Sequence, residues 1–238
     1  MMIKTIEICL VMGCIHWGCL KDANNRMIDF SYQPDVSPSK FTDPTNLSNP
    51  YYPLEMGKIY HYEGQTSDGF EVVEEHRSNE TRVIQGITVV VSKFKAWVDG
   101  VLIEEADDWL AQDNQGNLWY FGEAVNNYKP DGTLENHDGS WEAGIDGAKA
   151  GIIMPANPTI GLKYREEYYF NEAEDEAEIT GVNLDVTVPF GQYSNCIQTR
   201  NWTELEPDQI EHKFYTPGIG LIKEIETDNS EIVLTLIH

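Results

Sequence analysis

The sequence predicts a mainly β protein, in which an antiparallel meander closes into a β-barrel or a strongly curved sheet. Three observations support this fold class. Short runs of alternating or β-branched residues follow one another from residue 58 to the carboxyl end. Pairs of the kind that form hairpin turns, such as Asp-Gly, separate these runs. No apolar pattern with a helical period extends over about twelve residues, so few or no long helices are expected.

Each predicted strand ends at a recognisable turn signal. Gln85-Gly86 and Asp99-Gly100 can adopt the positive φ angles that tight hairpins require. The predicted strands cover residues 58–65, 70–85, 87–98, 101–112, 117–124, 162–170, 176–189, 196–205, 210–216, 220–226 and 231–237. So many strands in one chain would leave exposed edges unless the sheet curls, and a barrel that is lipocalin-like in shape solves this problem.

The amino terminus has the order of a secretory signal. Lys4 is followed by the apolar run 8–12, and then glycine precedes cysteine twice, at Cys14 and Cys19. This segment resembles a bacterial lipoprotein signal. The resemblance implies lipid attachment at Cys14 or Cys19 and an extracytoplasmic, membrane-anchored protein of the periplasm or cell surface. The alternative is an ordinary frayed amino terminus or a buried strand.

Three segments are predicted along the chain. Residues 1–19 form the signal peptide with its lipobox-like cysteines. Residues 20–55 are rich in Asn, Ser, Asp and Pro and lack periodicity, which is typical of a polar irregular linker. Residues 56–238 form a single β-rich domain, in which Cys196 is expected to be a buried small apolar residue.

Two stretches near the carboxyl end resemble known sequences. They are VTVPFGQYSNCIQT at 186–199 and YTPGIGLIKEIE at 215–226. Both are similar to segments of bacterial extracytoplasmic β-rich proteins, many of them uncharacterised lipoproteins. The resemblance implies a location and a fold, but it brings no catalytic residues with it.

The charge of the chain excludes some partners. The sequence has 40 acidic residues against 16 basic ones, for a net charge of -24. Such a surface repels nucleic acids and anionic membranes, so contact with a membrane is expected only through the lipid anchor. Solubility is the simplest role of this charge, and cation binding is the alternative.

The densest acidic run is a weak candidate for a calcium site. Its members are Glu172, Glu174, Asp175, Glu176 and Glu178. If the run is a strand, alternation puts its four glutamates on one face, where they repel one another unless Ca²⁺ binds. The spacing of an EF-hand loop is absent, so a solvated acidic turn without a cofactor is the preferred interpretation.

The strand at 117–124 is the candidate ligand-binding element. Alternation puts Trp119 and Phe121 on one face and Tyr120 on the other. Both faces are large and apolar, so both are expected to be buried against other parts of the protein. A Gly-rich stretch, 125–160, follows and carries Trp141 as a possible lid over a barrel mouth. The candidate ligand-binding residues are therefore Trp119, Tyr120, Phe121 and Trp141, and plain core packing is the alternative.

The leading functional hypothesis is a non-enzymatic lipoprotein that binds a small apolar or amphipathic ligand or an envelope protein. No nucleophile elbow, phosphate loop or metal-binding helix motif is present in the sequence. One alternative is a secreted glycan-active hydrolase that uses Glu123 and Glu142 as acid and base. Another is a Ca²⁺-dependent structural protein of the cell surface.

Overall fold

The computed structural model describes residues 28–227 and 230–237, and within them the chain is almost entirely β-structure. The elements are η1 (Pro38–Lys40), β1 (Ile59–Gln65), β2 (Phe70–Ile84), β3 (Ile87–Val98), β4 (Val101–Gln112), β5 (Leu118–Tyr128), β6 (Leu134–Asn136), β7 (Trp141–Glu142), β8 (Lys149–Met154), β9 (Lys163–Arg165), β10 (Glu167–Tyr168), β11 (Asp175–Val188), β12 (Gly191–Thr203), β13 (Ile210–Thr216), β14 (Gly220–Ile225) and β15 (Glu231–Ile237). In the described ranges no helix has the length and hydropathy needed to span a membrane.

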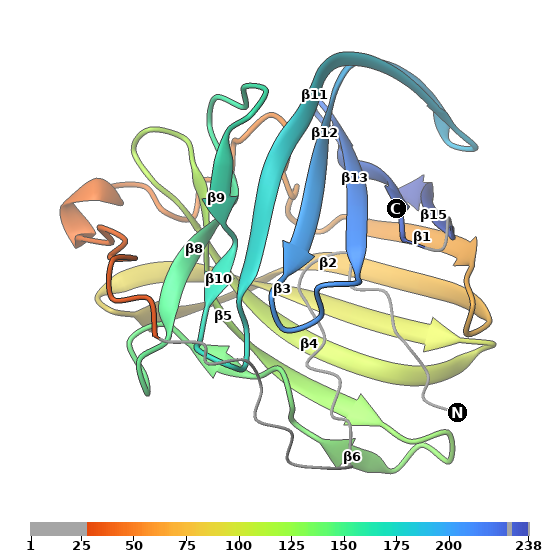
Figure 1. Ribbon diagram of the computed structural model, residues 1–238, viewed down its shortest axis with the longest axis horizontal. Coiled ribbons are helices and arrows are strands. Elements are labelled where there is room, and N and C mark those ends of the chain that lie inside the picture. The colour runs from red at the N-terminus through yellow and green to blue at the C-terminus, as the bar shows by residue number, and fades with distance from the viewer. Residues whose placement is uncertain (1–27, 228–229, 238) are drawn as a thin grey trace.

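All strands belong to one antiparallel sheet that curls on itself. Its order is β10-β8-β5-β4-β3-β2-β1-β15-β14-β13-β12-β11-β9, and β6 and β7 attach to β5. In Figure 1 the strands β1 to β4 run across the view, and β11 to β13 stand upright and cross them. The fold class expected from the sequence, an antiparallel meander that curls into a barrel, is confirmed.

One short segment of chain closes the barrel. Its first part, β9, pairs with β11, and its second part, β10, pairs with β8 at the opposite edge of the sheet. The residue between them, Glu166, donates its backbone N–H to the carbonyl of Asp175 at 2.8 Å. The predicted strand 162–170 is therefore two short strands, because the chain changes partner at Glu166. We call β8, β9 and β10 the seam.

The hairpin turns adopt the conformation that the sequence predicts. Gln85 and Gly86 have φ angles of 49° and 82°, and Asp99 and Gly100 have φ angles of 49° and 78°. Paired positive φ angles match the right-handed twist of the strands that they join. Each of these turns therefore fixes the register of its hairpin, β2–β3 and β3–β4.

The stretch 125–160 differs from its prediction as an irregular lid. It contains the end of β5 and the strands β6, β7 and β8, which pair with β5. Trp141 lies on β7 directly opposite Glu123 of β5, and only 4% of it is exposed. The stretch is therefore paired strand rather than an irregular loop here, and this tryptophan is part of the barrel wall.

The arm at residues 28–58 contains only the short η1 helix, but it packs tightly against the barrel. Phe41, Leu47, Tyr52 and Leu54 are all buried in the hydrophobic core. The ring of Phe41 lies 5.7 Å from that of Phe121. The core therefore includes side chains that come before the predicted start of the β domain at residue 56.

Candidate functional site

The interior of the barrel holds an unusual number of acidic side chains. Ten carboxyl groups are buried among the described residues: Glu71, Glu75, Glu104, Asp108, Glu123, Glu166, Glu167, Glu174, Asp175 and Glu224. Only two basic side chains in the same part of the chain, Arg77 and Lys213, are buried with them. Removing a charge from water is costly unless the charge is paired, so this excess of acids requires an explanation.

Strand alternation explains how the sequence places acids inside. On β4, Glu104 and Asp108 are buried, whereas Glu105 and Asp107 lie on the outer face and pair with lysines of β3. Glu123 is the cross-strand partner of Asp108. On β4, carboxyl groups that are adjacent in sequence therefore point to opposite faces of the sheet. The carboxyl groups that share the interior come from every second position of β4 or from the neighbouring strand β5.

A β-bulge turns Glu123 inward. Asp108 pairs with Glu123 and Leu110 pairs with Tyr120, so Phe121 and Gly122 together oppose a single residue of β4. Gly122 has a φ of 124°, and a Cβ there would lie 2.2 Å from the carbonyl oxygen of Trp141. The bulge lets Tyr120 and Glu123 share the interior face despite their odd spacing in the sequence.

The acids of β4 and β5 lie near Glu167 of the seam and Asp175 of β11. The pKa of Glu123 is raised by burial first, and then by the nearby charges of Asp108, Glu167, Glu104 and Asp175. Such mutual influence requires these groups to lie close together within the barrel. We call Glu104, Asp108, Glu123, Glu167 and Asp175 the acidic cluster.

Burial holds the members of the acidic cluster in their neutral form over a wide pH range. It raises the pKa of Glu104 to about 7 and that of Asp108 well above the usual range. The pKa values of Glu167 and Asp175 are also raised well above normal, by burial and then by neighbouring carboxyl groups. The hydroxyl of Tyr120 donates a hydrogen bond to Asp108 at 3.1 Å, which partly opposes this rise.

Several oxygens of the acidic cluster lack hydrogen-bond partners within the described ranges. They are Oε2 of Glu104, Oδ2 of Asp108, both carboxyl oxygens of Glu167 and Oδ1 of Asp175. The Trp141 indole and the Asp175 backbone lie near Glu167 and oppose the rise in its pKa, although neither reaches full hydrogen-bond geometry with its carboxyl oxygens. Buried polar atoms are rarely left unsatisfied, so these oxygens call for protons, water or a ligand.

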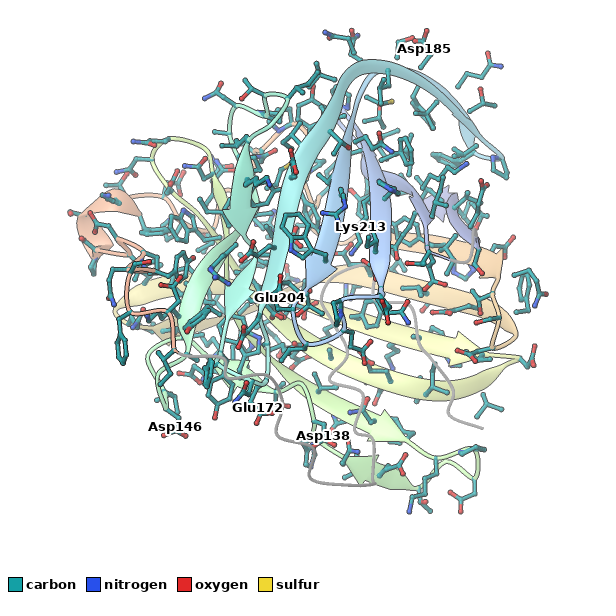
Figure 2. The ribbon with its side chains drawn as sticks, in the orientation of Figure 1. Asp138, Asp146, Glu172, Asp185, Glu204 and Lys213 are labelled. Carbon is teal, nitrogen blue, oxygen red and sulfur yellow. The ribbon has the colours of Figure 1, made fainter. Side chains whose placement is uncertain are left out.

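Lys213 balances a second group of interior acids. Its ammonium lies 2.9 Å from Glu211 and 3.8 Å from Glu224, and it also lowers the pKa of Glu166. Burial disfavours the charged form of Lys213, but these carboxylates more than offset burial and raise its pKa. Figure 2 shows Lys213 on β13 among the central strands, while Asp146 and Asp185 lie at the periphery.

The acidic run at 172–178 is built differently from its prediction. Glu174 accepts a hydrogen bond from the backbone N–H of Asn171, and Asp175 points into the barrel. Glu176 and Glu178 share the outer face, where they pair with Arg165 and Lys163 of β9. The expected repulsion along one face is thus relieved by basic partners. No set of three or more His, Cys, Asp or Glu side chains within the described ranges is arranged to hold a metal ion.

The predicted aromatic residues are all buried but lie on two faces of β5. Trp119 and Phe121 both contact Phe41 of the arm, and the Trp119 indole donates to Asp113 at 2.9 Å. Tyr120 stacks edge-to-face on Trp141 with ring centroids 5.2 Å apart. The pair Tyr120 and Trp141 therefore borders the acidic cluster, whereas Trp119 and Phe121 belong to the core beneath the arm.

The structure does not bring the predicted catalytic pair together. Glu123 is buried inside the barrel, whereas Glu142, the next residue after Trp141 on β7, is directed to the outer face. There the Glu142 carboxylate lies 2.6 Å from the guanidinium of Arg82, which stacks over Trp109. The candidate lipidation sites, Cys14 and Cys19, lie outside the described residues. Cys196 is a buried free cysteine, as expected.

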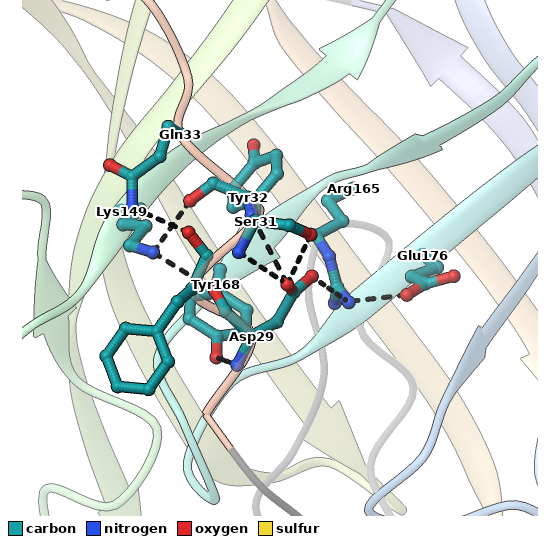
Figure 3. A network of polar contacts seen from close by, with 9 residues as sticks. Asp29, Ser31, Tyr32, Gln33, Lys149, Arg165, Tyr168 and Glu176 are labelled. Atoms are coloured by element: carbon teal, nitrogen blue, oxygen red, sulfur yellow. Dashed lines mark hydrogen bonds and ion pairs between the residues drawn. The ribbon is translucent and has the colours of Figure 1, made fainter.

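The arm is fastened to the seam by a polar network, shown in Figure 3. The rings of Tyr32 and Tyr168 lie 5.7 Å apart, with Arg165 over both of them. Arg165 also contacts Asp29 at 3.4 Å, and the Tyr32 hydroxyl donates to the carbonyl of Ala150 at 2.7 Å. On β10, Glu167 belongs to the acidic cluster and its neighbour Tyr168 lies beneath the arm, so this short strand connects the two features.

Sequence reasoning identified Glu123 and Asp175 but missed the rest of the acidic cluster. The two adjacent acidic pairs on the predicted strand 101–112, Glu104-Glu105 and Asp107-Asp108, were the available signal. That pattern does not reveal which face is interior, because β4 carries acids on both. The partners supplied by the seam depend on a long-range strand crossing that no local pattern encodes.

A comparison with solved structures found two similar chains. One is a "putative exported protein" with a YmcC-like fold from Bacteroides fragilis, with a TM-score of 0.45 and 14% identity over 79% of this chain and 98% of that one. The other is a "putative lipoprotein" from Parabacteroides distasonis, with a TM-score of 0.42 and 13% identity over 80% of this chain and 99% of that one. No protein-family model matches the sequence. No curated protein matches it either.

Proposed function

We propose that this chain is an extracytoplasmic lipoprotein whose barrel binds a small amphipathic molecule with a cationic group. The observation that carries the proposal is the acidic cluster, with its buried oxygens that lack hydrogen-bond partners among the described residues. Glu167 is the clearest member, because it is fully buried and its carboxyl oxygens are approached only by the Trp141 indole and the Asp175 backbone, neither of which reaches full hydrogen-bond geometry.

A positive charge is the natural complement of this cluster. Elsewhere in the barrel, Lys213 shows this pairing: its ammonium lies 2.9 Å from Glu211 and 3.8 Å from Glu224. The charges that raise the pKa values of Asp108, Glu123 and Glu167 are those of other carboxylates, and within the cluster Lys213 opposes the rise at Asp175. A ligand ammonium or guanidinium group would supply the missing donors and the missing charge.

The aromatic wall beside the cluster accounts for the amphipathic part of the proposal. Tyr120 and Trp141 present apolar ring surface next to the carboxyl groups. Aromatic rings hold both cations and methylene groups, so they suit a ligand with a charged head and an apolar body. A purely apolar ligand would leave the carboxyl groups unsatisfied.

The proposed location rests on the amino-terminal signal. Mass spectrometry of the mature amino terminus tests it directly, because lipidation at Cys14 or Cys19 adds acyl mass and removes the preceding residues. Replacing each cysteine in turn by serine should abolish the modification in one variant only. A mature chain that starts at Met1 or Met2 would exclude the anchor.

Matched probes test the binding function. We expect hexylamine to bind the protein in calorimetry at 0.15 M salt, and hexanoate of the same length to give no heat of binding. Glu167→Gln should weaken hexylamine binding at least tenfold, because glutamine cannot release a proton and form the carboxylate that pairs with the ligand's ammonium group. Glu178→Gln, on the outer face, is the control and should have no effect. If hexylamine and hexanol bind equally well, the site recognises apolar groups rather than cations. If hexylamine does not bind, the proposal is refuted.

A further inference from the structure

A small pocket opens beside Glu75 at one end of the row of interior acids. Its aromatic lining consists of Tyr52, Tyr60 and Tyr62. The space it encloses is about 10 Å³, which is enough for one water molecule or one ammonium group. Tyrosine faces and a carboxylate are the two kinds of group that attract an ammonium ion most strongly.

Glu75 gives this pocket a buried acidic end. It is only 3% exposed, and it accepts a hydrogen bond from the Tyr52 hydroxyl at 3.0 Å. Ser92 of β3 lies on its other side, with its hydroxyl 3.5 Å from the Glu75 carboxylate. Burial raises the pKa of Glu75 to about 7, so a cation bound there would be favoured at neutral pH and above.

The row of interior acids continues from Glu75 toward the acidic cluster. Ser92 is the cross-strand partner of Asp108, and Asp108 is the partner of Glu123. Glu75 also raises the pKa of Asp108, which shows that the two carboxyl groups lie within electrostatic reach. Neighbouring strands are about 5 Å apart, so the row Glu75, Asp108, Glu123 crosses about 15 Å of sheet from β2 to β5.

The spacing of this row selects the ligand. The carboxyl groups are spread along the barrel wall, and in the described residues they do not converge on a point where a metal ion could bind. A row of separate carboxylates in the protein is complementary to a ligand that carries separate positive charges along a flexible chain. The apolar segments between such charges could lie against the Tyr120 ring.

We propose, on the basis of the cation-binding function above, that the ligand is a linear aliphatic polyamine with a terminal ammonium group in the tyrosine pocket. Its remaining ammonium groups lie along Asp108 and Glu123 toward Glu167. The pocket must widen for the chain to enter. Two partly buried residues of its lining, Pro53 and Ile219, come from the arm and from the β13–β14 turn, so they can move without breaking the sheet.

Calorimetry with amines of increasing charge tests this inference. At 0.15 M salt, where exposed charges are screened, we expect spermidine to bind at least tenfold more tightly than propylamine. Glu75→Gln should remove most of that advantage while leaving hexylamine binding unchanged. Tyr60→Leu should also weaken spermidine binding, although this substitution does not change the charge of the pocket. Glu74→Gln is the matched control, since Glu74 precedes Glu75 and pairs with His61 on the outer face.

The outcomes separate the inference from the function on which it rests. If hexylamine binds in a Glu167-dependent way but spermidine binds no better than propylamine, the polyamine is excluded and the cation site remains. An equal loss of spermidine affinity in Glu74→Gln and Glu75→Gln would show non-specific attraction to an acidic surface and would overturn the inference. Mg²⁺ binding that depends on Glu75, without amine binding, would replace both proposals with a metal site.

Discussion

Gly122 shapes the barrel interior because any side chain at this position collides with the neighbouring strand. A Cβ on Gly122 would lie 2.2 Å from the backbone oxygen of Trp141, a contact that cannot be relieved by rotating a side chain. We expect Gly122→Ala to destabilise the protein by about 3 kcal/mol or more. Gly132 is the control, because it also has a positive φ, 81°, but nothing lies within 4 Å of its added Cβ. Gly132→Ala should cost only about 1 kcal/mol. Urea unfolding curves measure both values, and equal losses would show that the bulge is not constrained by β7.

The two candidate tryptophans of the ligand site should both behave as core residues in folding. Trp119 and Trp141 are 8% and 4% exposed, and each packs edge-to-face against a buried ring. Replacing either with alanine should cost about 3 to 5 kcal/mol, as for other large-to-small changes in a core. Trp202, half-buried beside Arg200 on the surface, is the comparison, and Trp202→Ala should cost much less. A near-neutral Trp141→Ala would restore the idea of a mobile lid.

Residue types predicted much of the fold and little of the site. The turn at Asp99-Gly100 was readable because its backbone angles depend on two adjacent residues. The inward direction of Glu123 was not readable, since it depends on a bulge at Gly122 and on the approach of β7. Glu142 looked like its catalytic partner in sequence, but the register of β7 directs it to the opposite face.

Among the elements, the seam joins the two ends of the sheet through only a few paired residues, and the arm reinforces it. β10 contributes two residues to its pairing with β8, and β9 contributes three to its pairing with β11. Arg165 links the seam to the arm through Asp29 and to β11 through Glu176. We expect Arg165→Ala to cost about 1 to 2 kcal/mol through lost packing and charge.

Hydrogen exchange distinguishes this effect from a general loss of stability. In Arg165→Ala, the amides of β10 should exchange faster while those of β3 keep their protection. Arg200→Ala is the matched control, because Arg200 also stacks on an aromatic ring, that of Trp202, but does not contact the arm. Uniformly faster exchange over all strands would show that the seam does not open separately from the rest of the barrel.

The long strands were predictable, whereas the short ones that complete the barrel were not. β2, β3 and β4 match the predicted ranges within a residue, because hairpins with tight turns are local structures. β6 and β7 are two or three residues long and lie in a Gly-rich stretch, so they have no periodicity to detect. The split between β9 and β10 follows from pairing with strands on either side of a closing sheet, which is a property of the tertiary fold.

For the whole molecule, the buried acids make stability depend on pH in an unusual direction. Burial raises the pKa values of Glu75, Glu104 and Glu166 to about 7, compared with an ordinary value of 4.5. Between these two pH values the folded protein binds more protons than the unfolded chain does. Stability that is fully present below pH 4.5 is therefore lost as the pH rises through 7. Each such group contributes at most about 3 kcal/mol, and less where the groups are coupled.

The expected result is a melting temperature that falls by several degrees between pH 5 and pH 8, opposite to the trend of proteins whose carboxylates are stabilised by salt bridges. Differential scanning calorimetry across this range measures it. Glu167→Gln should flatten the profile, because glutamine at this fully buried position carries no charge that must be desolvated at high pH. Glu178→Gln, on the outer face, should leave the slope unchanged.

A ligand that supplies positive charge to the acidic cluster should also flatten the profile, since it stabilises the ionised carboxylates as the pH rises. A melting temperature that rises from pH 5 to pH 8 in the unliganded protein would mean that the interior acids are already ionised and paired, and it would remove the electrostatic basis for a cationic ligand.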